Sequence, residues 1–159
     1  MGFRETAAEA DSNDLQRVAS LLGGARVLSR RLTSALDAHD LLLQGLPAAA
    51  LDYLVGRLVV IGKSDSIEKA VGMSVRTYQR RKEAPSRLLS PEQSGRTWKF
   101  AEILARATGI FGSQAEAEEW LERPATGLDQ RRPIDLLATP AGVELVEDHL
   151  LRLEYGVYA

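Results

Sequence analysis

Apolar residues recur every three or four positions along most of this chain, which is the spacing of one face of an α-helix. The pattern predicts a helix from Asn13 to the glycine pair at 23–24 and a second helical run over 27–43. Pro47 opens a third predicted helix, whose apolar positions continue to Ile61. No stretch alternates apolar and polar residues for long enough to predict a strand, so the expected fold class is all-α, a helical bundle.

Capping signals predict the helices of the second half. Ser90-Pro91-Glu92-Gln93 has an N-cap serine, a proline at the first helical position and a glutamine three residues after the cap. A long helix should begin there. The segment Ser113-Gln114-Ala115-Glu116 repeats the capping box and predicts the next helix. A short segment at 133–137 and a helix opening at Thr139-Pro140 complete the set.

Between these halves, residues 67–82 have the form of a helix-turn-helix, because two short amphipathic segments meet at Gly72. Gly72 can adopt the left-handed conformation that ends one helix, and Ser74 can cap the next. Val75 and Tyr78 are expected to face the protein core. The candidates for contact with DNA phosphates and base edges are Arg76, Thr77, Gln79, Arg80 and Lys82. A solvated charged helix, or a helix pair that only dimerises, would give the same pattern.

The distribution of charge along the chain bears on whether the helix-turn-helix binds DNA. The net charge is −2, yet residues 72–96 contain six basic and two acidic residues, whereas 115–122 contain four glutamates and no base. One face can therefore attract DNA while another repels it. The glutamates from Glu116 to Glu122 are expected to form a solvated face.

Composition narrows the chemistry. At 159 residues and 45% hydrophobic, the chain can bury a core, to which Trp98, Phe111 and Trp120 are expected to belong. It has no cysteine and only His39 and His149, which excludes thiolate chemistry and leaves little for an imidazole site. We expect no enzyme activity, no cofactor and no metal. Without a membrane-length apolar run or an export leader, a soluble cytoplasmic protein is expected.

A set of residues in the second half carries a family resemblance: Trp98, Ala105, Ala107, Phe111-Gly112, Ala117, Trp120-Leu121, Pro124, Leu128, Pro133-Ile134-Asp135-Leu136-Leu137, Thr139, Gly142, Val146, Leu150 and Leu153-Glu154-Tyr155-Gly156-Val157-Tyr158. In this order they resemble the Xre/ParS/MbcA-type antitoxins of type II toxin-antitoxin systems. The helix-turn-helix, followed by Leu89-Ser90-Pro91-Glu92, is similar to the family's Xre-like helix-turn-helix. The first fifty residues show no resemblance that helps to assign a function.

The resemblance implies a partner and a mechanism. Antitoxins of this family bind a RES-domain toxin that hydrolyses NAD or uses it to ADP-ribosylate a host protein, and they block its active site with the last helix and the carboxy-terminal tail. Carried over to this sequence, the toxin-binding residues would be Arg152, Glu154, Tyr155, Gly156, Val157 and Tyr158. A second implied function is repression of the antitoxin's own operon. Which reaction the toxin catalyses, its target and the stoichiometry stay open.

The expected organisation has three parts: a mobile arm over 1–12, a helical dimerisation and helix-turn-helix region over 13–88, and a toxin-binding antitoxin domain over 89–159. The apolar residues Leu41, Leu42, Leu43 and Leu46 exceed what two helix faces need, which indicates a homodimer within the toxin-antitoxin complex unless a compact core absorbs them. Two alternatives stay open: a tail folded back on its own domain, and a stand-alone helix-turn-helix transcriptional regulator.

Overall fold

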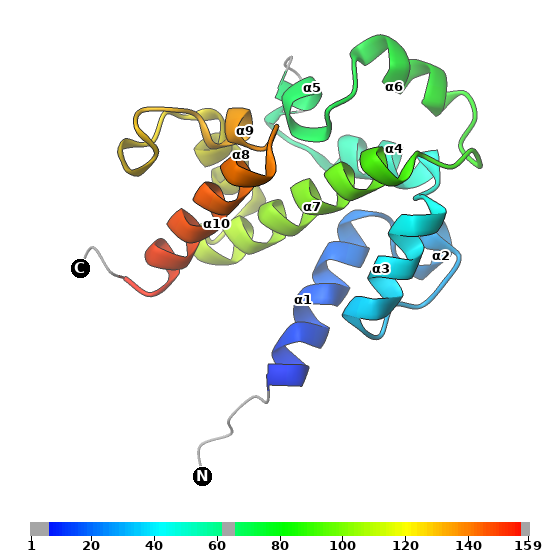
Figure 1. Cartoon of the computed structure of the whole chain (residues 1–159), viewed down its shortest axis with the longest axis horizontal. Helices are drawn as coiled ribbons and strands as arrows, with labels where there is room; N and C mark the ends of the chain where they lie inside the picture. Colours follow the sequence, from blue (N-terminus) through cyan, green and yellow to red (C-terminus); the bar gives the residue numbers. More distant parts are fainter. Residues whose placement is uncertain (1–6, 62–65, 157–159) are drawn as a thin grey trace.

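The computed structural model describes residues 7–61 and 66–156, with side chains from residue 13 onward. The described residues are built from helices joined by short turns and contain no strand, only two isolated bridges, so the all-α prediction is confirmed (Figure 1). The helices are α1 (Ala7–Leu21), α2 (Gly24–Leu28), α3 (Ala35–Gln44), α4 (Ala48–Arg57), α5 (Ser66–Val71), α6 (Val75–Lys82), α7 (Pro91–Phe111), α8 (Gln114–Glu122), α9 (Pro133–Leu136) and α10 (Pro140–Glu154), with a 3₁₀ turn at Thr126–Leu128.

Helix α7 is the central element of the fold. It runs through the middle of Figure 1 and contacts α1, α3, α5, α8 and α10. Phe100, Ile103 and Leu104 of this helix are almost completely buried, and Trp98 joins them in the core as the sequence predicts. A helix that is apolar on most sides must be covered on most sides, which is why the amino-terminal and carboxy-terminal helices both pack against α7.

The capping signals identify helix starts correctly. Ser90 accepts a hydrogen bond from the backbone N–H of Gln93 (3.1 Å), and the Gln93 side chain accepts one from the N–H of Ser90 (3.3 Å), which makes the predicted capping box. At α8 only half of the predicted box is present, because Ser113 accepts from the N–H of Glu116 without a return bond. Thr139 caps α10 in the same way, through the N–H of Gly142.

Three predicted helix boundaries were wrong. The run over 27–43 is split into α2 and α3 at Ser29, whose left-handed backbone (φ 58°) ends α2. The helix after Pro47 ends at Arg57 and does not reach Ile61, since Leu58 is extended and the N–H groups that follow bond to Glu118. Helix α1 begins at Ala7, inside the predicted arm, and residues 1–6 lie outside the described residues.

The leucines that suggested self-association divide between core and surface. Leu41 and Leu46 are buried, so the core absorbs part of the apparent excess. Leu43, by contrast, is 60% exposed on α3. Leu36, which lies two helical turns before it and was not among those leucines, is 67% exposed. The predicted homodimer stays a prediction.

Candidate functional site

The helix-turn-helix is formed by α5 and α6 around Gly72. Gly72 has φ +67°, the left-handed conformation predicted for it, and Ser74 caps α6 by accepting from the N–H of Thr77 (3.2 Å). Arg96 of α7 contacts the turn, and its Nη2 donates a hydrogen bond to the carbonyl of Lys69 (2.7 Å). Its Nη1 lies so close to Gly72 that a Cβ at position 72 would be only 2.7 Å away. Burial lowers the pKa of the Arg96 guanidinium. This arginine, counted among the basic residues of the sequence, is therefore structural.

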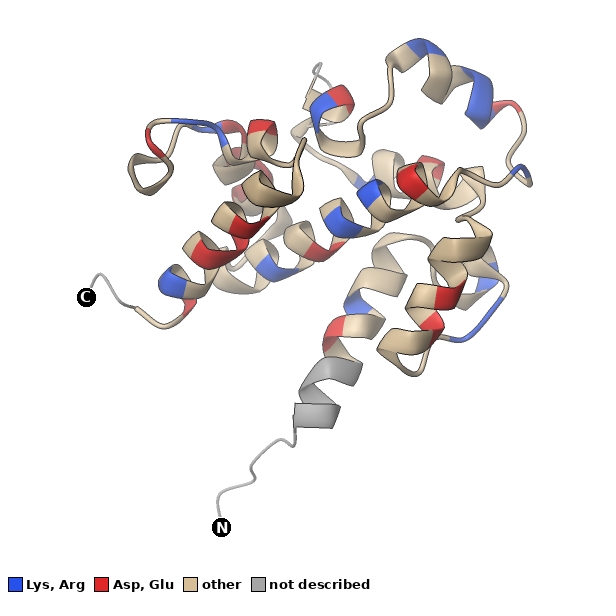
Figure 2. Cartoon of the chain, in the orientation of Figure 1, with Lys and Arg blue, Asp and Glu red and all other residues tan. Residues whose placement is uncertain are grey.

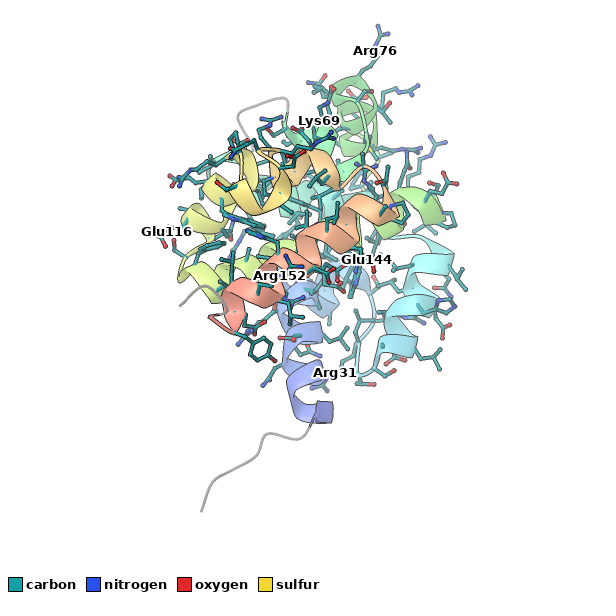
Figure 3. The ribbon with its side chains drawn as sticks, turned by 60° about the vertical axis from the view of Figure 1, so that its left-hand side comes forward. Arg31, Lys69, Arg76, Glu116, Glu144 and Arg152 are labelled. Atoms are coloured by element: carbon teal, nitrogen blue, oxygen red, sulfur yellow. The ribbon has the colours of Figure 1, made fainter. Side chains whose placement is uncertain are left out.

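Helix α6 carries its basic side chains on the outside of the molecule. Arg76, Gln79, Arg80 and Lys82 are exposed, and Figure 2 shows the lysines and arginines of α6 at the upper edge of the chain. In Figure 3 the side chain of Arg76 points away from the body of the protein. The fifth candidate, Thr77, is half-buried and its hydroxyl accepts a hydrogen bond from the Ser74 hydroxyl (3.0 Å). The structure thus groups four candidates on one solvent-facing helix.

Helix α6 contacts the rest of the protein through the packing of Tyr78 and through polar contacts to Asp52. No side chain of α6 is fully buried, and Val75, predicted to face the core, is 45% exposed, so that prediction was wrong. Tyr78 does face inward: its hydroxyl donates to Oδ1 of Asp52 on α4 (2.8 Å), and Lys82 Nζ lies 4.0 Å from the same oxygen. Burial first, and then Asp52, raises the pKa of Tyr78. Asp52 was missed from sequence because nothing in its neighbourhood marks it.

A second surface is the outward face of α10. Its exposed apolar side chains are Leu145 (54%), Leu151 (43%) and Tyr155 (75%). At 100° per residue, the two leucines mark the edges of the exposed face and Tyr155 lies between them. Glu144 and Arg152 lie on the same face, along the helix in Figure 3. The face combines apolar area with both signs of charge.

The inner face of α10 fixes its position on the fold. Val146 and Leu150 are fully buried, and His149 stacks on Trp120 of α8, with ring centroids 5.9 Å apart and planes 4° from parallel. Trp120 in turn contacts Phe111 (5.3 Å), so both predicted core aromatics pack at the edge of the core. Burial, and then the charge of Arg152, lowers the pKa of His149.

The predicted toxin-binding residues do not all share one environment. Arg152 and Tyr155 are exposed, and Gly156 has φ +64°, which allows the chain to leave the helix. Glu154 instead accepts from Nη2 of Arg106 on α7 (3.4 Å) and ties the end of α10 to the fold. The last two, Val157 and Tyr158, lie outside the described residues.

Glu118 departs from the solvated face that the sequence predicts for the glutamates of α8. This glutamate has no exposed surface, whereas Glu116 and Glu119 are exposed. Its carboxylate accepts hydrogen bonds from the N–H groups of Val59 (3.0 Å), Val60 (2.8 Å) and Ile61 (2.9 Å), and one from Gln114 Nε2 (2.9 Å). The glutamates of α8 are not one solvated face, because this one binds the segment that leads from α4 towards α5.

Within the described part of the chain, no group of three histidine, aspartate or glutamate side chains could hold a metal ion. His39 is exposed on α3. Among the described helices none has the length and apolar character needed to cross a membrane.

An exposed basic helix-turn-helix and an outward-facing carboxy-terminal helix define a two-part class of protein, with one surface suited to DNA and one suited to a protein partner. The antitoxin Xre-like helix-turn-helix domain matches residues 37–102, and the antitoxin Xre/MbcA/ParS C-terminal toxin-binding domain matches residues 106–156. The chain belongs to the Xre antitoxin family, whose members carry a helix-turn-helix and a toxin-binding domain in a toxin-antitoxin system.

Three relatives named "Antitoxin Xre" support this assignment. The one from Photorhabdus laumondii is 30% identical over 120 residues, which cover 75% of this chain and 79% of the relative. The one from Yersinia enterocolitica is 35% identical over 94 residues, 58% of this chain and 63% of the relative. The one from Pseudomonas putida is 29% identical over 125 residues, 79% and 76% of the two chains. The family predicted from the sequence is thereby confirmed.

Proposed function

We propose that this chain neutralises a RES-domain toxin, one that consumes NAD or uses it for ADP-ribosylation, by covering the toxin's active site with α10 and the carboxy-terminal tail. The observation that supports this best is the outward face of α10. Leu145, Leu151 and Tyr155 expose apolar surface on a helix whose opposite face is fully packed, so a partner can bury them without disturbing the fold.

The contact set in this proposal differs from the one expected from sequence alone. Arg152 and Tyr155 keep the role of toxin contacts, and Leu145 and Leu151 join them. Glu154 acts by holding the helix end through Arg106. Gly156, Val157 and Tyr158 remain proposed contacts of the tail.

A second part of the proposal is that α6 binds operator DNA and represses the antitoxin's own operon, as a cytoplasmic homodimer. Arg76, Gln79, Arg80 and Lys82 are exposed on one helix and can reach phosphates or base edges. The chain is not proposed to be an enzyme: its role in the reaction is to exclude substrate from the toxin.

The test is co-purification with the protein encoded by the adjacent gene, followed by an assay of NAD loss. The full chain should bind and suppress NAD loss, whereas a chain that ends at Leu153 should bind weakly and fail to suppress it. Leu151→Asp should also weaken binding, by about tenfold or more, because it places a charge in a buried apolar contact. Leu36→Asp, an equally drastic change on exposed α3, is the matched control and should bind normally.

The runner-up is a stand-alone transcriptional regulator. It requires α6 and not α10, so it predicts that truncation after Leu153 leaves DNA binding intact and that no neighbouring gene product binds.

The pair of leucine variants tests the proposed use of α10. If Leu36→Asp and Leu151→Asp both lose toxin binding, that use is contradicted.

A further inference from the structure

A pocket of about 720 Å³ lies between α2, the α3–α4 turn and the loop that follows α6. Arg26 and Arg30 line it from the α2 side, and Pro85, Ser86 and Leu88 line it from the loop side. No acidic residue is among the lining residues. The two arginines precede residue 37, where the helix-turn-helix family match begins, so the family match does not account for them.

Arg30 lies in the wall of this pocket and has one guanidinium nitrogen without an acceptor. Its Nη1 atom is buried and has no hydrogen-bond partner within the described structure, although its side chain as a whole is partly exposed. A guanidinium nitrogen without an acceptor is energetically costly. Because Nη1 is closed off from solvent, the part of Arg30 available to a ligand in the pocket is the exposed remainder of its side chain.

The surroundings of Arg30 favour an anion over a neutral ligand. Arg26 adds a second positive charge from the last turn of α2, and Ser29, Gln44 and Ser86 supply neutral polar groups. Arginine pairs with phosphate through two parallel N–H bonds, a geometry that favours this anion. The net charge of the chain is −2, but the pocket is lined by two arginines and no acidic residue. The electrostatic potential at the pocket is therefore positive although the chain as a whole is negative.

The position of the pocket points to DNA as the source of the phosphate. Its loop wall, residues 85–88, follows the end of α6 at Lys82 after two intervening residues, Glu83 and Ala84. Figure 2 shows lysines and arginines both on α6 and along the connection from α2 to α3, at the same right-hand end of the molecule. A duplex that reaches α6 therefore runs towards a second basic surface.

We propose that this pocket is a phosphate-binding site, in which Arg26 and Arg30 hold a backbone phosphate of the DNA that α6 contacts. The pocket adds affinity and orientation without reading sequence, because phosphates carry no base information. The proposal rests on the DNA-binding part of the proposed function. It assigns a role to residues upstream of the family's helix-turn-helix.

The first test uses inorganic phosphate and the full chain. Amide NMR shifts of Ser29 and Gly45 should change as phosphate replaces chloride at constant ionic strength, and Arg30→Gln should abolish the change. The control Arg31→Gln removes the same charge one residue away, from an exposed position that does not line the pocket, and should respond as the natural chain does. No shift in the natural chain, or an equal loss in Arg31→Gln, overturns the site.

The second test measures affinity for the DNA upstream of the gene against salt concentration. Arg30→Gln should weaken binding about tenfold at fixed salt and lower the slope of log K against log salt by about 0.9, on all sequences alike. Arg31→Gln should change the slope less. If the natural chain binds DNA and Arg30→Gln leaves the slope unchanged, DNA is not the ligand and the proposal fails.

If the natural chain does not bind DNA at all, the DNA-binding part of the proposed function fails on its own. The titration with inorganic phosphate then decides whether the pocket binds phosphate from a free compound. Thermal unfolding midpoints equal to that of the natural chain show that the variants are folded.

Discussion

Glu118 joins α8 to the segment that follows α4 by hydrogen bonds. Its carboxylate, on α8, accepts from three successive backbone N–H groups at Val59, Val60 and Ile61. These three N–H groups lie beyond the end of α4 at Arg57. A carboxylate that binds several N–H groups is stable in a buried site, since the hydrogen bonds offset its loss of hydration.

Replacing Glu118 by Ala should therefore destabilise the protein by about 3 kcal/mol, because buried donors lose their acceptor. Glu118→Gln should cost less, since the amide oxygen can still accept. Urea unfolding monitored by circular dichroism measures both. The matched control is Glu119→Ala, which removes only an exposed ion pair to Arg123 and should change stability by well under about 1 kcal/mol. Equal losses for the two alanine variants would refute the role given to Glu118.

His149 makes the packing of α10 sensitive to acid. Its pKa is lowered, mainly by burial and then by Arg152, so the folded state favours the neutral imidazole. The stability that this contributes is present above the ordinary histidine pKa of about 6.5 and is lost as the pH falls through that value towards the lowered one.

We expect the chain to unfold more readily at pH 5 than at pH 7, and His149→Phe, which can still stack on Trp120, to show a smaller difference. Thermal unfolding across this pH range gives the comparison. NMR titration of the imidazole C–H signals should give a pKa for His149 below that of exposed histidine. A pKa at or above the ordinary value would contradict this account.

Helices α9 and α10 meet at a corner that only glycine allows. A Cβ at Gly142 would lie 1.9 Å from the carbonyl oxygen of Leu136, a backbone atom that cannot rotate away. The corner sets the direction in which α10 leaves α9, and with it the position of the face proposed for the toxin.

Gly142→Ala should destabilise the chain by about 2 to 4 kcal/mol and weaken toxin binding, because α10 must shift. Gly95→Ala is the control within α7: nothing lies near its Cβ position, and it should stabilise the protein by up to about 1 kcal/mol through helix propensity. Denaturant unfolding of the two variants, with the natural chain as reference, tests the pair. A tolerated alanine at 142 would show that the corner can relax.

The elements of this fold differ in how far they could be predicted from sequence. Helix starts at Ser74, Ser90 and Thr139 were predictable because the cap residue and its N–H donor are local. The end of α4 was not, since Glu118, nearly sixty residues away, supplies the competing acceptor. The basic residues of α6 could be found from sequence, whereas Asp52, which binds Tyr78, depends on a tertiary contact.

Helices from both sides of residue 88 pack against one another. Helix α7 packs against α1, α3 and α5 as well as α8 and α10, and α9 contacts α5. The two family matches meet inside α7, between residues 102 and 106. The predicted division into a region over 13–88 and a domain over 89–159 is a proposal about function. In the structure, each part covers side chains of the other.

Residues 89–159 produced alone should accordingly lack cooperative thermal unfolding, since buried side chains of α7 such as Phe100 would lose covering helices and Glu118 would lose its donors. The full chain should unfold in one sharp transition. Circular dichroism against temperature distinguishes the two. A cooperative transition in the fragment would establish the carboxy-terminal part as an independent domain.

Because α6 contributes no fully buried side chain, its sequence can change with little cost to the core. Ser74, Gly72 and Tyr78 must be kept for the turn, the cap and the contact to Asp52, but the outward positions are free of packing constraints. If α6 binds operator DNA as proposed, gene copies that descend from one ancestor can acquire separate operators by substitution at a few exposed sites, while the face of α10 proposed for the toxin is inherited unchanged.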